Sequence, residues 1–527
     1  MRTVRDAAFE VLRQQGLTRI FANPGSTEVA LLADLPDDLD FVLGLHEGSV
    51  VGMASGHALA TGSPALVLLH TTAGFGNAVG AIATARTNKA PLVILVGQQD
   101  RRHVASEPFL AGHLDGLAGA YAVSSRQPAR AADVPAAIAR AAHEAALHRG
   151  PAVVVVPMND WAEPADDTIA VPAPVRLRVS RGVDEKVGAE LAAALDGASS
   201  PVLVVGPGAD SAEGWAALGA LADRLDCPVW QEAHGSQAGF PQDSPRFRGH
   251  LPAGRAALRD ALTPHDVVLV AGGPAFRQGT WEPGHFVTAG TTVLVVTADT
   301  EEASYSAAHL AVIGDVARVV ADLAERVAPR SAPEAQPPRS RVALPAVDSL
   351  RAEHVFAALA DRLPEEATVF EESPSSRRLL LDLMPTRRPF GFVTVAQGGL
   401  GFALPASIGV RMARPNRPVV ALLGDGASLY NIQGLWSAQH YGVGTLFVVL
   451  SNGGYAVMDR LAAGHGGKPP WPAFTEVSVS TIAAGFGCAT SRVTTHDELT
   501  DQLDLILPTL GERTEPLLLE VVVEATA

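Results

Sequence analysis

Two short polar segments in the last third of the chain have the residue types of a metal and phosphate site. GDG (424–426) follows one apolar run, and SNGG (451–454) ends the next. The carboxylate of Asp425, the amide oxygen of Asn452 and a backbone carbonyl are hard ligands that suit Mg²⁺ or Ca²⁺. Glycines let the backbone approach a diphosphate, and the helix N-termini that follow favour its charge. Either motif alone is equally typical of an ordinary turn, but the pair predicts a cation and diphosphate site.

Three polar residues in the first third stand at the ends of successive apolar segments. Ser26 follows FANPG (21–25), Glu47 follows FVLGLH (41–46), and His70 ends PALVLLH (64–70). Taken singly, Glu47 is typical of a helix N-terminus, and His70 of a histidine paired with a nearby backbone group. Together they indicate one site, because the carboxyl ends of parallel strands gather at one edge of a sheet.

A recurring order of elements would position these residues. Short apolar runs without alternation are followed by a Gly-rich turn and a helical stretch, which indicates strands buried on both faces in βαβ units. The runs lie at 64–70, 90–97, 152–157, 201–208, 266–273, 291–297, 418–426 and 445–454. We therefore predict an α/β protein with doubly wound parallel sheets, whose ligands bind beyond the carboxyl ends of the strands.

Two proline-rich segments divide the chain. Residues 163–175 combine proline with acidic residues, and residues 328–345 are rich in proline without a helical period. Both compositions are typical of linkers. We predict three α/β domains of similar size, at 1–165, 175–328 and 345–527.

Composition excludes several classes of function. The 527 residues carry a formal net charge of −16 without a Lys/Arg-rich run, which argues against nucleic acid or an anionic membrane as a partner. Two cysteines are too few for a disulfide framework or a Cys-based zinc site. The first 16 residues indicate an amphipathic helix without a signal-peptide core, and no apolar run is long enough to span a bilayer. We expect a soluble, cytoplasmic protein.

The combined motifs resemble those of thiamine diphosphate-dependent enzymes of the pyruvate decarboxylase superfamily, most closely the benzoylformate decarboxylases. The segments that carry the resemblance are FANPGSTE (21–28), HEGSVVGMASGHA (46–58), GQQDR (97–101), FRGHLPAG (247–254), WEPG (281–284), GGLGFALPASIG (398–409) and GDGASLY (424–430). The resemblance implies a pyrimidine-binding domain, a middle domain without cofactor and a diphosphate-binding domain, in that order. It implies thiamine diphosphate and Mg²⁺ as cofactors.

The resemblance also implies roles for individual residues. Glu47 matches the glutamate that hydrogen-bonds the aminopyrimidine and promotes loss of the thiazolium proton. Ser26 matches a substrate-carboxylate binder, and His70 matches an active-site acid/base. Leu400 matches the apolar residue that wedges the cofactor into its bent shape.

The remaining matches concern the metal, the diphosphate and the substrate. Asp425, Asn452 and the carbonyl oxygen of Gly454 match the Mg²⁺ ligands. The other matched cofactor-binding residues are Ser373, Ser375, Gly398, Gly424, Gly426, Ala427, Tyr430 and Tyr455. The substrate pocket implied by the match consists of Ser26, His70, Leu110, Gly279, Pro374, Val457 and Leu461.

The chain departs from the family pattern in this pocket. Gly279 stands where the decarboxylases have a second active-site histidine, and Pro374 replaces a threonine beside the cofactor. Val457 and Leu461 match residues of different size. Either His113 or His465 is a candidate for the missing proton donor, but nothing in the sequence places either imidazole at the site.

The resemblance implies non-oxidative decarboxylation of an aryl or bulky apolar 2-keto acid to an aldehyde and CO₂. The alternative is a carboligase that forms 2-hydroxy ketones or acetolactate-like products, which the loss of a proton donor at Gly279 would favour. A non-catalytic cofactor-binding paralogue is disfavoured by the intact Glu47. A nicotinamide dehydrogenase is disfavoured because no GxGxxG opens a βαβ unit. The resemblance further implies sites shared between subunits, hence a homodimer at least and usually a homotetramer.

Overall fold

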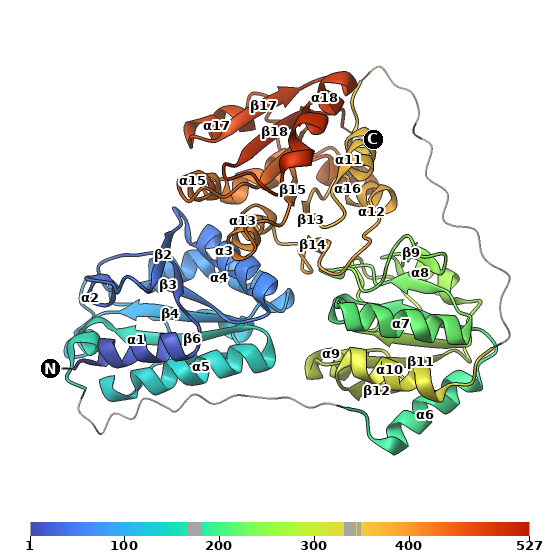
Figure 1. Ribbon diagram of the computed structural model, residues 1–527, viewed down its shortest axis with the longest axis horizontal. Helices are drawn as coiled ribbons and strands as arrows, with labels where there is room; N and C mark the ends of the chain where they lie inside the picture. Colours follow the sequence, from blue (N-terminus) through green and yellow to red (C-terminus); the bar gives the residue numbers. More distant parts are fainter. Residues whose placement is uncertain (1, 166–181, 331–343, 345–348, 526–527) are drawn as a thin grey trace. The chain divides into compact units, whose positions relative to one another are not determined.

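Three parallel six-stranded sheets with helices packed against them form the computed structural model (Figure 1). This confirms the predicted α/β class. The structure describes residues 2–165, 182–330, 344 and 349–525, and the predicted linkers at 163–175 and 328–345 lie largely outside these ranges. By contacts the chain divides into two units: Met1–Arg178 with Phe370–Ser375 and Gln397–Ala527, and Val179–Val369 with Ser376–Ala396. The three domain boundaries stay predictions.

The first sheet has the strand order β2-β1-β3-β4-β6-β5. Its strands are β1 (Arg19–Asn23), β2 (Asp40–Leu43), β3 (Ala65–His70), β4 (Leu92–Gln98), β5 (Ser124–Arg126) and β6 (Pro151–Pro157). Its helices are α1 (Val4–Gln14), α2 (Val29–Leu32), α3 (Glu47–Thr61), α4 (Thr71–Thr87) and α5 (Val134–His148). Every residue of β4 and β6 is buried, which explains their unbroken apolar runs. The strand order reverses between β1 and β3, so ligands are expected where these two strands end.

The second sheet has the order β12-β11-β10-β7-β8-β9. Its strands are β7 (Pro201–Val205), β8 (Val229–Gln231), β9 (Phe247–His250), β10 (Val267–Ala271), β11 (Thr292–Thr297) and β12 (Leu310–Ile313). Its helices are α6 (Glu185–Asp196), α7 (Ala212–Leu225), α8 (Arg255–Leu262), α9 (Thr300–Tyr305) and α10 (Val316–Arg326). Successive residues of β7 and β10 alternate between two apolar clusters, which lie on opposite faces of the sheet.

Backbone fills the crevice where the second sheet reverses its strand order. Gly206 N–H donates to the carbonyl of Ala271 at 2.9 Å, and Gly208 N–H donates to that of Gly272 at 2.7 Å. Gly272 has φ +85°, and a Cβ there would lie 2.5 Å from the nitrogen of Ala209. The ends of β7 and β10 therefore pack directly on each other.

The third sheet has the order β14-β13-β15-β16-β18-β17. Its strands are β13 (Thr368–Glu372), β14 (Phe392–Thr394), β15 (Val419–Gly424), β16 (Leu446–Ser451), β17 (Ala489–Val493) and β18 (Leu517–Val522). Its helices are α11 (Ala352–Arg362), α12 (Arg377–Leu383), α13 (Ala403–Ala413), α14 (Asp425–Ser428), α15 (Gly434–His440), α16 (Ala456–Gly464), α17 (Val479–Gly485) and α18 (His496–Ile506). The order reverses between β13 and β15, the strands that end in Glu372 and Gly424.

Helices α3 and α13 pack with their backbones in close contact. A Cβ at Gly56 would lie 1.9 Å from the carbonyl oxygen of Ala406, and one at Gly409 would lie 1.9 Å from that of Met53. Small residues are therefore required on both helices, which explains why α3 is buried nearly all round. Because α3 begins at Glu47 and α13 follows the loop of Leu400, this contact fixes two elements that carry predicted site residues.

No helix among the described residues has the length and apolar character needed to cross a membrane.

Candidate active site

His70 ends β3 and is held by two polar neighbours from the loop after β1. Its Nδ1 lies 3.0 Å from Oε2 of Glu28 and 3.0 Å from Oγ1 of Thr27. The Thr27 hydroxyl donates to the other oxygen of Glu28, so both neighbours can accept a hydrogen bond from Nδ1–H. Of the two neutral tautomers, this arrangement favours the one with its proton on Nδ1, in which Nε2 is the acceptor.

Two glycines make room for this pair. A Cβ at Gly25 would lie 2.4 Å from the ring of His70, and one at Gly97 would lie 1.7 Å from Oε1 of Glu28. Ser26, which follows Gly25, is exposed. Sequence reasoning missed Glu28, although it stands in the same FANPGSTE segment as Ser26.

Glu47 is the first residue of α3 and is buried. Its carboxylate accepts hydrogen bonds from Nδ2 of Asn23 at 3.0 Å and of Asn77 at 3.1 Å. A Cβ at Gly74 would lie 3.4 Å from Cβ of His70 and 3.5 Å from Oε1 of Glu47. The Cβ of His70 and the carboxylate of Glu47 therefore both lie beside Gly74.

The two polar loops of the third sheet meet at Asp425. Its Oδ2 accepts from the backbone N–H groups of Asn452 at 2.9 Å and Gly453 at 2.7 Å, and its Oδ1 accepts from Gly426 at 2.7 Å. Burial raises the pKa of Asp425, while these N–H donors oppose the rise. The donor set fits a hard cation, because it offers a carboxylate, the Asn452 amide oxygen and backbone carbonyls.

The space around these loops suits a bound group. A Cβ at Gly454 would meet no atom within 4 Å, and one at Gly424 would meet only the carbonyl oxygen of Glu372, at 4.0 Å. The ring of Tyr455 covers Gly426, where a Cβ would lie 2.5 Å from it. Ala427 is buried and Tyr430 is exposed. No group of three His, Cys, Asp or Glu in the described ranges forms a metal site.

The loop after β13 is tied to α16. Ser375 Oγ accepts from Val457 N–H at 3.1 Å, and its carbonyl accepts from Arg460 at 2.7 Å. Ser373 is buried and donates to Glu371. Pro374, which stands between Ser373 and Ser375, is exposed. Leu461, one turn after Val457, is 53% exposed. Gly398, with φ +74°, and Leu400 lie in the loop before α13.

The remaining candidates come from other loops. Leu110 has φ +67° and sits in the loop after β4. Gly279 belongs to the other unit. A Cβ at Gly279 would lie 3.9 Å from Nε2 of His234. His113 and His465 are both exposed. The imidazole beside Gly279 is therefore His234, which sequence reasoning did not consider.

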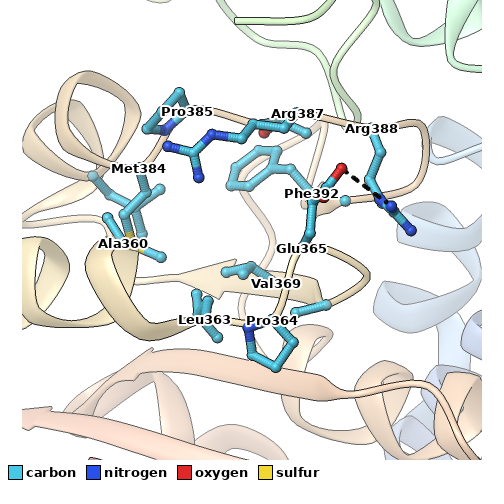
Figure 2. Close-up of a pocket in the computed structure, with 14 residues that line it drawn as sticks. Ala360, Leu363, Pro364, Glu365, Val369, Met384, Pro385, Arg387, Arg388 and Phe392 are labelled. Atoms are coloured by element: carbon cyan, nitrogen blue, oxygen red, sulfur yellow. Dashed lines mark hydrogen bonds and ion pairs between the residues drawn. The ribbon is translucent and has the colours of Figure 1, made fainter. Parts of the chain in front are cut away.

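A separate cavity lies between α11, α12 and β14 (Figure 2). Leu363, Met384 and Phe392 are among its apolar lining residues. The arginines at its edge are engaged: Arg388 binds Glu365 at 3.2 Å, and Arg387 lies 3.6 Å from Asp243. None of the candidate site residues lines this cavity.

Comparison with known proteins identifies the family. The chain matches the thiamine pyrophosphate enzyme models for the N-terminal TPP binding domain (residues 2–119), the central domain (189–323) and the C-terminal TPP binding domain (375–521). Benzoylformate decarboxylase of Pseudomonas aeruginosa is 38% identical over 99% of both chains.

Solved structures similar to this chain belong to the same family. The thiamine diphosphate-dependent 4-hydroxybenzoylformate decarboxylase of Rhodococcus jostii RHA1 has a TM-score of 0.95 and 34% identity over 100% of both chains. Benzoylformate decarboxylase from Polynucleobacter necessarius has a TM-score of 0.94 and 30% identity, covering 100% of this chain and 99% of that chain. The chain therefore belongs to the thiamine pyrophosphate enzyme family, as a thiamine diphosphate-dependent decarboxylase closely related to benzoylformate decarboxylase.

Proposed function

We propose that the enzyme decarboxylates an aryl 2-keto acid of the benzoylformate type to an aldehyde and CO₂, with Mg²⁺ as the metal. The observation that carries this proposal is the imidazole of His70, which is oriented by Glu28 and lies, like the carboxylate of Glu47, beside Gly74. The aryl substrate is inferred from the names of the relatives, whose similarity runs the length of the chain.

The metal and diphosphate would be held by the loops of the third sheet. Asp425, Asn452 and the carbonyl of Gly454 would bind Mg²⁺, because they offer the oxygen ligands that this cation prefers. Ser373, Ser375 and the glycines of GDG (424–426) would lie along the diphosphate. When bound, thiamine diphosphate supplies the electron sink that receives the electrons of the broken carbon–carboxyl bond.

Proton handling falls to Glu47 and His70. Asn23 and Asn77 fix the Glu47 carboxylate while leaving it lone pairs, so that it can share a proton with a ring nitrogen of the cofactor. His70 Nε2 would exchange a proton with the substrate-derived oxygen or carbon, because Nδ1 is already engaged. Ser26, which is exposed and follows Gly25 in the loop that contacts this imidazole, would donate its hydroxyl to the substrate carboxylate.

The substrate side chain would contact Leu110, Pro374, Val457 and Leu461. We further propose a homodimer, assembled into a homotetramer, in which two chains share each site.

A panel of 2-keto acids tests the proposal. The purified protein with thiamine diphosphate and Mg²⁺ is given benzoylformate, phenylpyruvate, a branched 2-keto acid and pyruvate, and both CO₂ and organic products are measured. We expect the highest kcat/KM for benzoylformate, with an aldehyde as product. A preference for pyruvate with acetolactate as product would favour the carboligase instead.

A further inference from the structure

Glu372 is a buried carboxylate with no part in the chemistry described above. It ends β13 and accepts three backbone hydrogen bonds: from Gly401 at 2.5 Å, from Phe402 at 2.8 Å and from Ala403 at 2.7 Å. Burial raises the pKa of Glu372 to about 7, and the three N–H donors act against this rise. These bonds satisfy the first N–H group of α13, that of Ala403, and the two N–H groups before it; the N-cap of this helix, Phe402, offers no side-chain cap.

Asn431 holds the same loop from a second direction. Its Nδ2 donates to the carbonyl oxygen of Gly401 at 2.5 Å. Gly401 has φ +91°, and a Cβ there would lie 2.6 Å from this nitrogen. The Oδ1 of Asn431 lies 3.4 Å from Oγ of Ser49, two residues after Glu47 in α3. Both peptide groups of Gly401 are therefore fixed by buried side chains.

The first three residues of the loop, Gln397, Gly398 and Gly399, are exposed. A Cβ at Gly398 would meet no atom within 4 Å, although one at Gly399 would lie 3.1 Å from Oγ1 of Thr84. A loop with a fixed base and an exposed tip takes its shape from the base. The two anchoring side chains thus fix the backbone that directly follows Leu400.

We propose that Glu372 and Asn431 are positioning residues for thiamine diphosphate: by fixing Gly401, they hold Gly398 and Leu400 in the conformation that receives the cofactor. The inference rests on the assignment of Leu400 to the cofactor under the proposed function, but not on the identity of the 2-keto acid. Because Glu372 occupies the N-terminus of α13, the cofactor's diphosphate is expected to bind elsewhere.

Cofactor titration of the apoenzyme tests this inference without any substrate. Glu372→Gln replaces one acceptor oxygen by an amide that faces N–H donors, so we expect the Kd for thiamine diphosphate, at fixed Mg²⁺, to rise about tenfold or more. Hydrogen exchange at Gly401, Phe402 and Ala403 should become faster in the same variant. Asn431→Asp, which removes the amide donor to Gly401, should also weaken binding of thiamine diphosphate. This variant provides the test if Glu372→Gln fails to fold.

Two further variants distinguish a positioning role of Glu372 from a general effect of altering a buried carboxylate, and test whether the loop contacts the cofactor. Glu302→Gln alters another buried carboxylate, which accepts from Thr297 in the other unit, and should leave the Kd unchanged. Leu400→Ala should raise the Kd; if it does not, the loop lies outside the cofactor site and the inference is overturned together with that assignment. If Leu400→Ala weakens binding but Glu372→Gln and Asn431→Asp bind as the wild type does, the inference alone is overturned.

Discussion

Nδ1 of His70 lies 3.0 Å from a carboxylate oxygen of Glu28, a side chain that is 1% exposed. A buried carboxylate in this place fixes both the orientation and the tautomer of the imidazole. This orientation supports an acid/base role for His70. A hydrogen bond from the imidazole to a backbone group alone would not support that role.

Glu28→Gln should therefore impair catalysis without preventing cofactor binding. The amide cannot replace the carboxylate as an acceptor at both oxygens, so the orientation of His70 is lost and kcat should fall about 10²-fold or more. Gly97→Ala should produce a similar loss, because its Cβ would displace Oε1 of Glu28. Glu10→Gln, at a partly exposed ion pair with Arg2, is the matched control. Wild-type kcat in Glu28→Gln would rule out this role.

Asp425→Asn should abolish stabilisation by the metal and cofactor. At a hundredfold excess over its Kd a ligand stabilises the wild type by about 2.7 kcal/mol, and the variant should gain almost nothing in a thermal unfolding assay. Because burial raises the pKa of Asp425, protons should compete with Mg²⁺ at a higher pH than for an exposed aspartate, and affinity should fall as the pH is lowered. An equal gain in Tm for both proteins would contradict the assignment.

His57 should make the protein sensitive to acid. It lies in α3 against Phe21, and burial, followed by the charge of Arg19, lowers the pKa of its imidazole to about 4. The unfolded chain binds this proton more readily, so folded-state stability should fall as the pH drops from about 6.5 to 4, by up to about 1.4 kcal/mol per pH unit. His57→Gln should flatten this part of the stability profile. An unchanged slope would mean that other groups govern acid unfolding.

Gly279→His should change the balance of products. If the missing imidazole slows aldehyde release, restoring it should raise the ratio of aldehyde to hydroxy ketone about tenfold or more. The new side chain would meet His234, whose Nε2 lies 3.9 Å from the Cβ position, so the substitution should also be made with His234→Gln. An unchanged ratio in both backgrounds would show that position 279 does not control the product.

The fold was predictable because its central strands are buried on both faces. β6 and β10 are apolar throughout and β4 is apolar up to Gln98, so their runs indicated parallel sheets without help from periodicity. The meeting of Asp425 with Asn452 also followed from sequence, because both residues follow adjacent parallel strands. Local composition and topology were sufficient for these features.

The supporting side chains could not be predicted in this way. Glu372 binds N–H groups 29 to 31 residues further along the chain, and Asn431 reaches Gly401 from another loop. His234 and Gly279 approach each other from loops after different strands. Such contacts depend on tertiary packing, and a buried glutamate has no sequence pattern that distinguishes it from an exposed one.

The central claim is tested most directly by the products that the cofactor-loaded enzyme forms from benzoylformate. We predict CO₂ and benzaldehyde in equal amounts from the wild type, and neither from Glu47→Gln although that variant still binds thiamine diphosphate. Failure of the cofactor-bound wild type to release CO₂ from benzoylformate would contradict the account.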